Sequence, residues 1–205
     1  MGYFIVFIVA FLANILVLYS LYNKGEKGIA NILIKMFSKK RNIAAALLYL
    51  ASMEFVFNNE KQFRYYAFSF VILTVLYVVT LIDMDKYIIL NKLLIIMAAA
   101  ALGNLLLNHN ITYIAALLGV LIMGGTMFLI SKATRGGLGL GDVKLFAVLG
   151  LWLGIYGVMS VCILAIFATA ILSIVLLIKD RNNKNKAIPF SPFIYVSVVI
   201  TLISI

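Results

Sequence analysis

The chain has 205 residues, of which 65% are hydrophobic and 12% are charged, and its mean hydropathy is +1.14. A soluble domain is about half apolar and about a quarter charged, so this composition excludes an ordinary soluble fold. The net charge of +10 would indicate nucleic-acid binding in a soluble protein, but in a membrane protein it reports first on the placement of loops.

Long apolar segments follow one another along the chain. A helix needs about 20 apolar residues to cross the hydrocarbon core, so the chain has room for about eight crossings and no separate soluble domain. Backbone groups in lipid must form their hydrogen bonds within the segment, and runs this uniform exclude a β-barrel. The sequence therefore predicts an all-α transmembrane bundle of about eight spans. These spans are Tyr3–Leu21, Ile43–Phe57, Tyr65–Ile82, Leu93–Leu107, Ile111–Ile130, Leu145–Tyr156, Val158–Ile178 and Phe190–Ile205.

The connections between the predicted spans differ in charge. If the spans alternate in direction, 15 Lys and Arg residues lie on one side and only Lys61 and Arg64 on the other. Short loops rich in Lys and Arg stay in the cytoplasm. We therefore expect a multi-pass protein of the cytoplasmic (inner) membrane with both termini outside. Its partner is the lipid bilayer. The topology explains the basic charge, so we expect no nucleic acid as a partner.

The longest inner connection, residues 23–42, combines lysines with apolar residues at helical spacing. It could lie as an amphipathic helix on the anionic inner leaflet, or it could contact a substrate or pack within the bundle. We expect residues 1–205 to form one membrane domain, with residues 1–64 as its N-terminal part and residues 65–205 as its core.

Three acidic residues, Asp83, Asp85 and Asp142, lie where a predicted span meets an inner loop. Carboxylates at a membrane boundary are costly to desolvate and often mark a polar cavity, an ion path or a catalytic site. Each also has a purely structural explanation. Asp142 could cap a helix after a glycine-rich loop, and Asp83 and Asp85 could belong to a solvated helix end.

Taken together, these acids indicate a particular chemistry more clearly than each one does alone. Asp142 and either Asp83 or Asp85 place two carboxylates from different helices on the cytoplasmic side. Two nearby carboxylates share a proton, so one can activate water as a general base while the other protonates a carbonyl oxygen. The alternative is an ion- or proton-coupled transporter. It would be expected to carry acids near the middle of its spans and internal repeats, whereas these acids lie at span ends.

Two motifs in the chain resemble those of the type IV prepilin peptidases, which are membrane aspartyl proteases of the GxGD type related to preflagellin peptidases. The GxGDxK motif is matched by Gly139, Gly141, Asp142 and Lys144. In the first motif, an Asp is followed about six to eight residues later by an apolar residue, Pro, and Asp or Asn. It is matched by Asp83 and Ile89–Asn91, with Leu90 in place of Pro.

A third segment, Pro189–Phe193, is similar to the family's Pro-Phe-Gly-Pro-Phe, with Ser191 in place of Gly. It could equally be the plain start of a helix, because Pro is tolerated in a first turn.

The resemblance implies an endopeptidase that removes the short basic leader of prepilins or pseudopilins after a Gly at the cytoplasmic membrane face. It implies Asp83 and Asp142 as the catalytic pair, in preference to Asp85. Gly139, Gly141 and Asn91 are expected to support the site, and Lys144 to orient Asp142 or to contact lipid headgroups.

Larger members of the family bind zinc through two Cys-x-x-Cys pairs, and many also N-methylate the new amino terminus with S-adenosylmethionine. This chain has the single cysteine Cys162, so we expect no zinc site of that kind and a buried, apolar role for the thiol. We expect no cofactor, apart from S-adenosylmethionine if the methyltransferase activity is present.

Overall fold

A computed structural model describes residues 63–108, 111–134, 137–179 and 188–204, and every regular element in these residues is helical. The first two predicted spans and the basic connection at residues 23–42 lie outside the described residues. The elements are α4 (Phe63–Lys86), α5 (Asn91–Asn108), α6 (Tyr113–Leu118), the π-helical η1 (Gly119–Met123), α7 (Gly124–Ala133), α8 (Leu140–Lys179) and α9 (Ser191–Ser204).

Four helical segments are long and apolar enough to cross a membrane. They are α4, α5, the continuous rod formed by α6, η1 and α7, and α8; α9 is apolar but shorter. The described part of the chain is therefore an all-helical, multi-pass membrane bundle, which confirms the all-α, membrane-spanning part of the prediction. The number of about eight spans and the location of the termini stay predictions.

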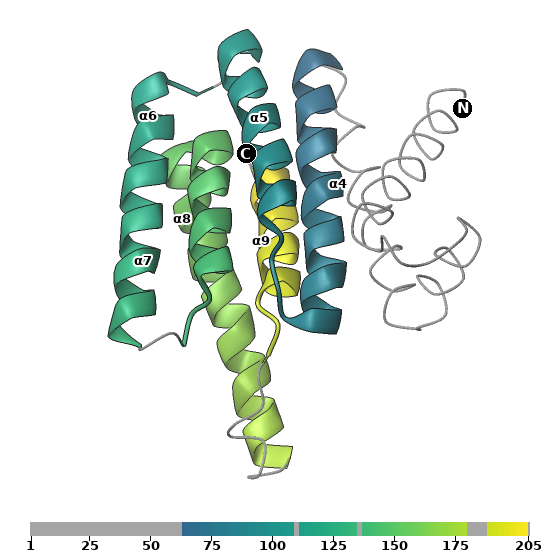
Figure 1. Ribbon diagram of the computed structural model, residues 1–205, viewed down its shortest axis with the longest axis vertical. Helices are drawn as coiled ribbons and strands as arrows, with labels where there is room; N and C mark the ends of the chain where they lie inside the picture. Colours follow the sequence, from purple (N-terminus) through teal and green to yellow (C-terminus); the bar gives the residue numbers. More distant parts are fainter. Residues whose placement is uncertain (1–62, 109–110, 135–136, 180–187, 205) are drawn as a thin grey trace, which may run out of the picture.

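Helix α8 is divided by a break at Gly154. The φ of this residue is 68° and its ψ is −178°, so it leaves the helical region while the helix continues on either side. Figure 1 shows that the chain reverses its direction there, so the two halves of α8 run past each other. The sequence predicted two spans meeting at Gly157; the turn instead uses Gly154, because a left-handed φ is open to glycine at little steric cost.

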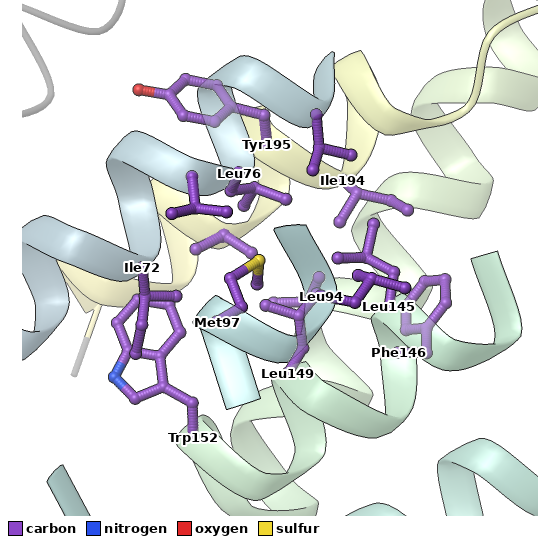
Figure 2. Packing of buried hydrophobic residues seen from close by; sticks show 14 of the residues in the cluster. Ile72, Leu76, Leu94, Met97, Leu145, Phe146, Leu149, Trp152, Ile194 and Tyr195 are labelled. Atoms are coloured by element: carbon purple, nitrogen blue, oxygen red, sulfur yellow. The ribbon is translucent and has the colours of Figure 1, made fainter. Parts of the chain in front are cut away.

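The core lies among α4, α5, α9 and the first half of α8. Figure 2 shows Ile72 and Leu76 of α4 facing Met97 of α5, Leu149 of α8 and Ile194 of α9, and all five side chains are buried. In the most apolar stretch of α4, between Phe68 and Lys86, 78% of the residues are buried. In the most apolar stretch of α8, only 17% are buried. Helix α4 is therefore central to the bundle, and much of α8 is left with an apolar exposed surface suited to lipid.

One helix crossing is held close by glycines. A Cβ atom on Gly119 would lie 2.5 Å from the carbonyl oxygen of Gly150, and a Cβ on Gly150 would lie 2.5 Å from that of Gly119. Any side chain at either position would separate η1 from α8. Small residues allow such close backbone approach between membrane helices.

Candidate functional site

Four helix ends meet at one end of the bundle. Helix α4 ends there, and α5, α8 and α9 begin there, as Figure 1 shows at its lower side. Asp83 belongs to the last turn of α4, and Asp142 to the first turn of α8. The fold thus brings to one end of the bundle two acidic residues that are separated by 59 positions along the chain.

Asp83 is buried, with 7% of its surface exposed. Its Oδ2 atom accepts a hydrogen bond of 3.1 Å from the backbone N–H of Ser191, the first residue of α9. The carbonyl oxygen of Ser191 in turn accepts a bond of 3.4 Å from the hydroxyl of Thr80, one turn before Asp83 on α4. Asp83 is therefore held against the start of α9 and does not belong to a solvated helix end.

Asp142 is partly buried and is the third residue of α8. Its carboxylate accepts a hydrogen bond from the backbone N–H of Gly139, the residue just before the helix, and it lies within the electrostatic influence of Asp83. A side chain at the third helical position that binds back to the capping residue forms half of a capping box. Asp142 therefore helps to cap α8, as one of the two interpretations predicted, but Gly139 occupies the cap position itself. The same carboxylate also feels the charge of Asp83.

Gly141 allows the two sequence motifs to touch. A Cβ atom at this position would lie 2.8 Å from the Cβ of Ile89, in the segment that joins α4 to α5. That segment begins at Tyr87, which has a left-handed φ of 56°, and turns the chain into α5. The glycine is therefore required here for close packing between the GxGD motif and the first motif.

Lys144 and Asn91 form a second contact between the motifs. The Lys144 Nζ donates a hydrogen bond of 2.9 Å to the Asn91 Oδ1. Both side chains are exposed, so the contact lies at the surface of the site. The sequence predicted that Lys144 orients Asp142 or binds lipid headgroups. The structure instead places its amine on the amide of the first motif, which joins the start of α5 to the first turn of α8.

The glycine-rich loop before α8 is anchored to α7. The hydroxyl of Ser131, a buried residue of α7, donates a hydrogen bond of 2.7 Å to the carbonyl oxygen of Leu138. Leu138 immediately precedes Gly139, whose N–H binds Asp142. The anchor thus fixes the backbone that positions the Asp142 carboxylate.

Asp85 differs from Asp83 in its surroundings. Its side chain is exposed, because residues two apart on a helix point in different directions. This agrees with the expectation that only one of the two acids points into the bundle, and that this acid is Asp83.

The hydrogen bond from the Ser191 N–H to Asp83 is a contact that the sequence did not predict. The segment Pro189–Phe193 was open to two interpretations, a family motif or the start of a helix. The structure shows that α9 starts within it, and the family motif stays a prediction. Pro192 lies in the first turn of α9, and the preceding Phe190 packs on Phe146 with ring centroids 5.9 Å apart. The two prolines drew attention to this segment. They could not predict the hydrogen bond, because a backbone N–H donor does not depend on which side chain the residue carries.

Each of the two carboxylates accepts a hydrogen bond from a backbone N–H at a helix start, and the charge of Asp83 acts on Asp142. In general, a pair of nearby carboxyl groups can serve as general base and general acid toward water. Among the described residues, no group of three His, Cys, Asp or Glu side chains could hold a metal ion. Cys162 is buried in α8, as predicted for an apolar thiol.

Comparisons with known proteins agree with these motifs. The model of the type IV leader peptidase family matches residues 70–174, a range that includes both aspartates. No solved structure gives a significant match to the chain.

Three curated relatives carry the name prepilin leader peptidase/N-methyltransferase. Those of Aeromonas salmonicida (strain A449) and Aeromonas hydrophila are each 31% identical over 134 residues, which is 63% of this chain and 46% of the relative. That of Bacillus subtilis (strain 168) is 28% identical over 177 residues, covering 85% of this chain and 68% of the relative. The chain thus matches about half the length of the Aeromonas relatives.

Proposed function

The chain belongs to the type IV leader peptidase family, and from this premise we propose that it is a membrane aspartyl endopeptidase that removes the leader of type IV prepilins or pseudopilins. The substrate is a protein with a short basic leader that ends in Gly and precedes an apolar segment. The proposal rests above all on one observation, the convergence of Asp83 and Asp142 at one end of a membrane bundle.

The proposed reaction uses the two carboxylates in opposite protonation states. One carboxylate takes a proton from water as the water oxygen bonds to the carbonyl carbon of the leader glycine. The protonated partner gives its proton to the carbonyl oxygen. The C–N bond of the resulting intermediate then breaks, and the leaving amine takes up a proton from the pair.

The proposed topology places this chemistry at the cytoplasmic face of the inner membrane. We propose about eight spans, both termini outside, residues 1–64 as N-terminal helices and residues 65–205 as the peptidase core. Lys86, Lys92, Lys132 and Lys144 support this orientation, because they belong to the helix ends that surround the site. A leader that remains in the cytoplasm would reach the aspartates from the same side.

The methyltransferase activity in the relatives' names is kept separate from this proposal. S-adenosylmethionine becomes a cofactor of this chain only if the mature pilin carries a methyl group on its new amino terminus. Mass spectrometry of that terminus, from cells in which this chain is the only leader peptidase, distinguishes a peptidase from a bifunctional enzyme.

Asparagine substitutions test the peptidase role. Asp83→Asn and Asp142→Asn keep the shape of the side chains but remove the acid and base groups, so we expect each to lower leader removal at least about 100-fold. The measurement is the mobility shift of a prepilin in cells that lack other leader peptidases, with membrane insertion checked by blotting.

The matched control is Asp85→Asn. Asp85 lies two residues from Asp83 on the same helix and is exposed, so its substitution should leave processing near the wild-type level. Full processing by the Asp83→Asn protein would refute the assignment of the catalytic pair.

A further inference from the structure

Two features of its surroundings leave the Asp83 carboxylate with little support from its own helix. The side chain is buried, so few water molecules can reach it. Asp83 also belongs to the last turn of α4, where its own carbonyl oxygen accepts the N–H of Tyr87 at 2.9 Å. The negative end of the helix dipole lies at that turn and repels an anion.

One group on a different helix acts in the opposite direction. Ser191 is the first residue of α9, and its N–H has no acceptor within its own helix because the first four N–H groups of a helix never do. This N–H donates to the Asp83 Oδ2 at 3.1 Å. Ser191 is fully buried, so the bond is shielded from water.

The position of the Ser191 peptide is fixed from both sides. Its carbonyl oxygen accepts the Thr80 hydroxyl, and the preceding Phe190 is packed on Phe146 of α8. The Ser191 hydroxyl itself has no hydrogen-bond partner among the described residues, so the contact with Asp83 is made by the backbone alone.

The charged groups of α4, α5 and α8 at this end of the bundle are few. Helix α8 contributes Asp142 and Lys144, α5 contributes Lys92, and α4 adds Asp85 and Lys86, which are exposed. The Lys144 amine donates to Asn91, and Lys92 is exposed.

We propose that the backbone N–H of Ser191 is the positioning donor of Asp83, because it holds Oδ2 in place and so directs the other carboxylate oxygen toward the attacking water. The inference rests on the proposed peptidase function and extends it to α9, which the family model does not cover. Ser191 acts through Asp83 and is not itself catalytic.

A comparison of Ser191→Pro with Ser191→Ala tests the donor. Proline removes the N–H and is accepted at the first position of a helix, whereas alanine keeps the N–H and removes only the hydroxyl. With the purified protein and a prepilin carrying a basic leader that ends in Gly, we expect Ser191→Pro to lower kcat about tenfold or more with little change in KM. Ser191→Ala should remain close to wild type.

A backbone ester covers the case in which the proline variant fails to fold. Lactic acid at position 191, introduced by cell-free translation into nanodiscs with an acylated suppressor tRNA, differs from Ser191→Ala only by an oxygen in place of N–H. We expect the same loss of kcat, again with little change in KM.

The possible results separate the two proposals. Equal kcat values for the ester and Ser191→Ala would overturn the role of the N–H while the peptidase function stands. A wild-type protein that leaves the prepilin uncut would overturn the peptidase function itself, and the role of Ser191 in catalysis with it.

Discussion

At the scale of single residues, the site depends on glycines that lack a Cβ atom and on backbone N–H groups. Gly141 has no Cβ, so the segment that contains Ile89 can pack directly on the first turn of α8. The carboxylates of Asp83 and Asp142 are then held by backbone N–H groups of Ser191 and Gly139. The glycines of the GxGD motif therefore serve the geometry of the acids.

Gly141→Ala should damage the site by forcing the two motifs apart. The added methyl group would lie 2.8 Å from the Ile89 Cβ, and neither atom is the end of a flexible chain. We expect a loss of about 1–3 kcal/mol in the free energy of unfolding, as for other overpacked sites, and a clear loss of leader cleavage. Thermal unfolding in detergent can be followed by the fluorescence of Trp152, the single tryptophan, which is buried.

Gly125→Ala is the matched control for this substitution. A Cβ at Gly125 of α7 meets nothing within 4 Å, so the variant should be as stable as the wild type or slightly more stable. Equal melting temperatures for the Gly141→Ala and wild-type proteins would contradict the close packing of the motifs.

At the scale of helices, the sequence predicted the elements better than their junctions. The apolar runs after residue 64 correspond to helices α4 to α9, because such runs have no other way to satisfy backbone groups in lipid. The start of α8 was missed by five residues, since Leu140–Lys144 contains Gly and charged residues and yet continues the helix. The turn at Gly154 was placed at Gly157, because several glycines could supply it and only packing selects one.

The site was predictable to a similar extent. Asp83, Asp142, Gly139, Gly141, Asn91 and Lys144 were all chosen from motif spacing, and the structure brings these residues to the same end of the bundle. The bond from the Ser191 N–H could not be predicted, because every residue except Pro carries that donor. The contact of Lys144 with Asn91 likewise depends on the relative placement of α5 and α8.

The crossing of η1 and α8 provides a prediction at this scale. Gly150→Ala places a methyl group 2.5 Å from the Gly119 carbonyl oxygen, a backbone atom that can move only with its helix. We expect a loss of about 1–3 kcal/mol in unfolding free energy, measured by the same Trp152 fluorescence. The crossing lies away from the aspartates, so the protein that remains folded should keep its KM. Unchanged stability would show that the two backbones are farther apart.

At the scale of the whole molecule, polarity is arranged along the bundle axis. The acids and Lys86, Lys92, Lys132 and Lys144 lie at one end, where α4 and α7 finish and α5 and α8 begin. The connection that contains Thr112 lies at the other end, and α9 finishes there (Figure 1). This polarity is what the charge pattern of the sequence predicts for an inner-membrane protein whose site faces the cytoplasm.

Cysteine labelling tests this orientation. In a Cys162→Ser background, a cysteine in place of Lys92 should react with a membrane-impermeant maleimide only after the inner membrane is opened. A cysteine in place of Thr112 should react in intact spheroplasts, and both positions are exposed. The reverse pattern would place the aspartates outside, where they could not meet a leader retained in the cytoplasm.

The central claim is that Asp83 and Asp142 together cut a prepilin leader. The most direct measurement incubates the purified protein in nanodiscs with a prepilin and identifies the new amino terminus by mass spectrometry over time. The account predicts a single cut after the leader Gly by the wild type and no cut by the Asp83→Asn, Asp142→Asn double variant. Cleavage by the double variant at the wild-type rate, or a cut at another position by the wild type, would contradict it.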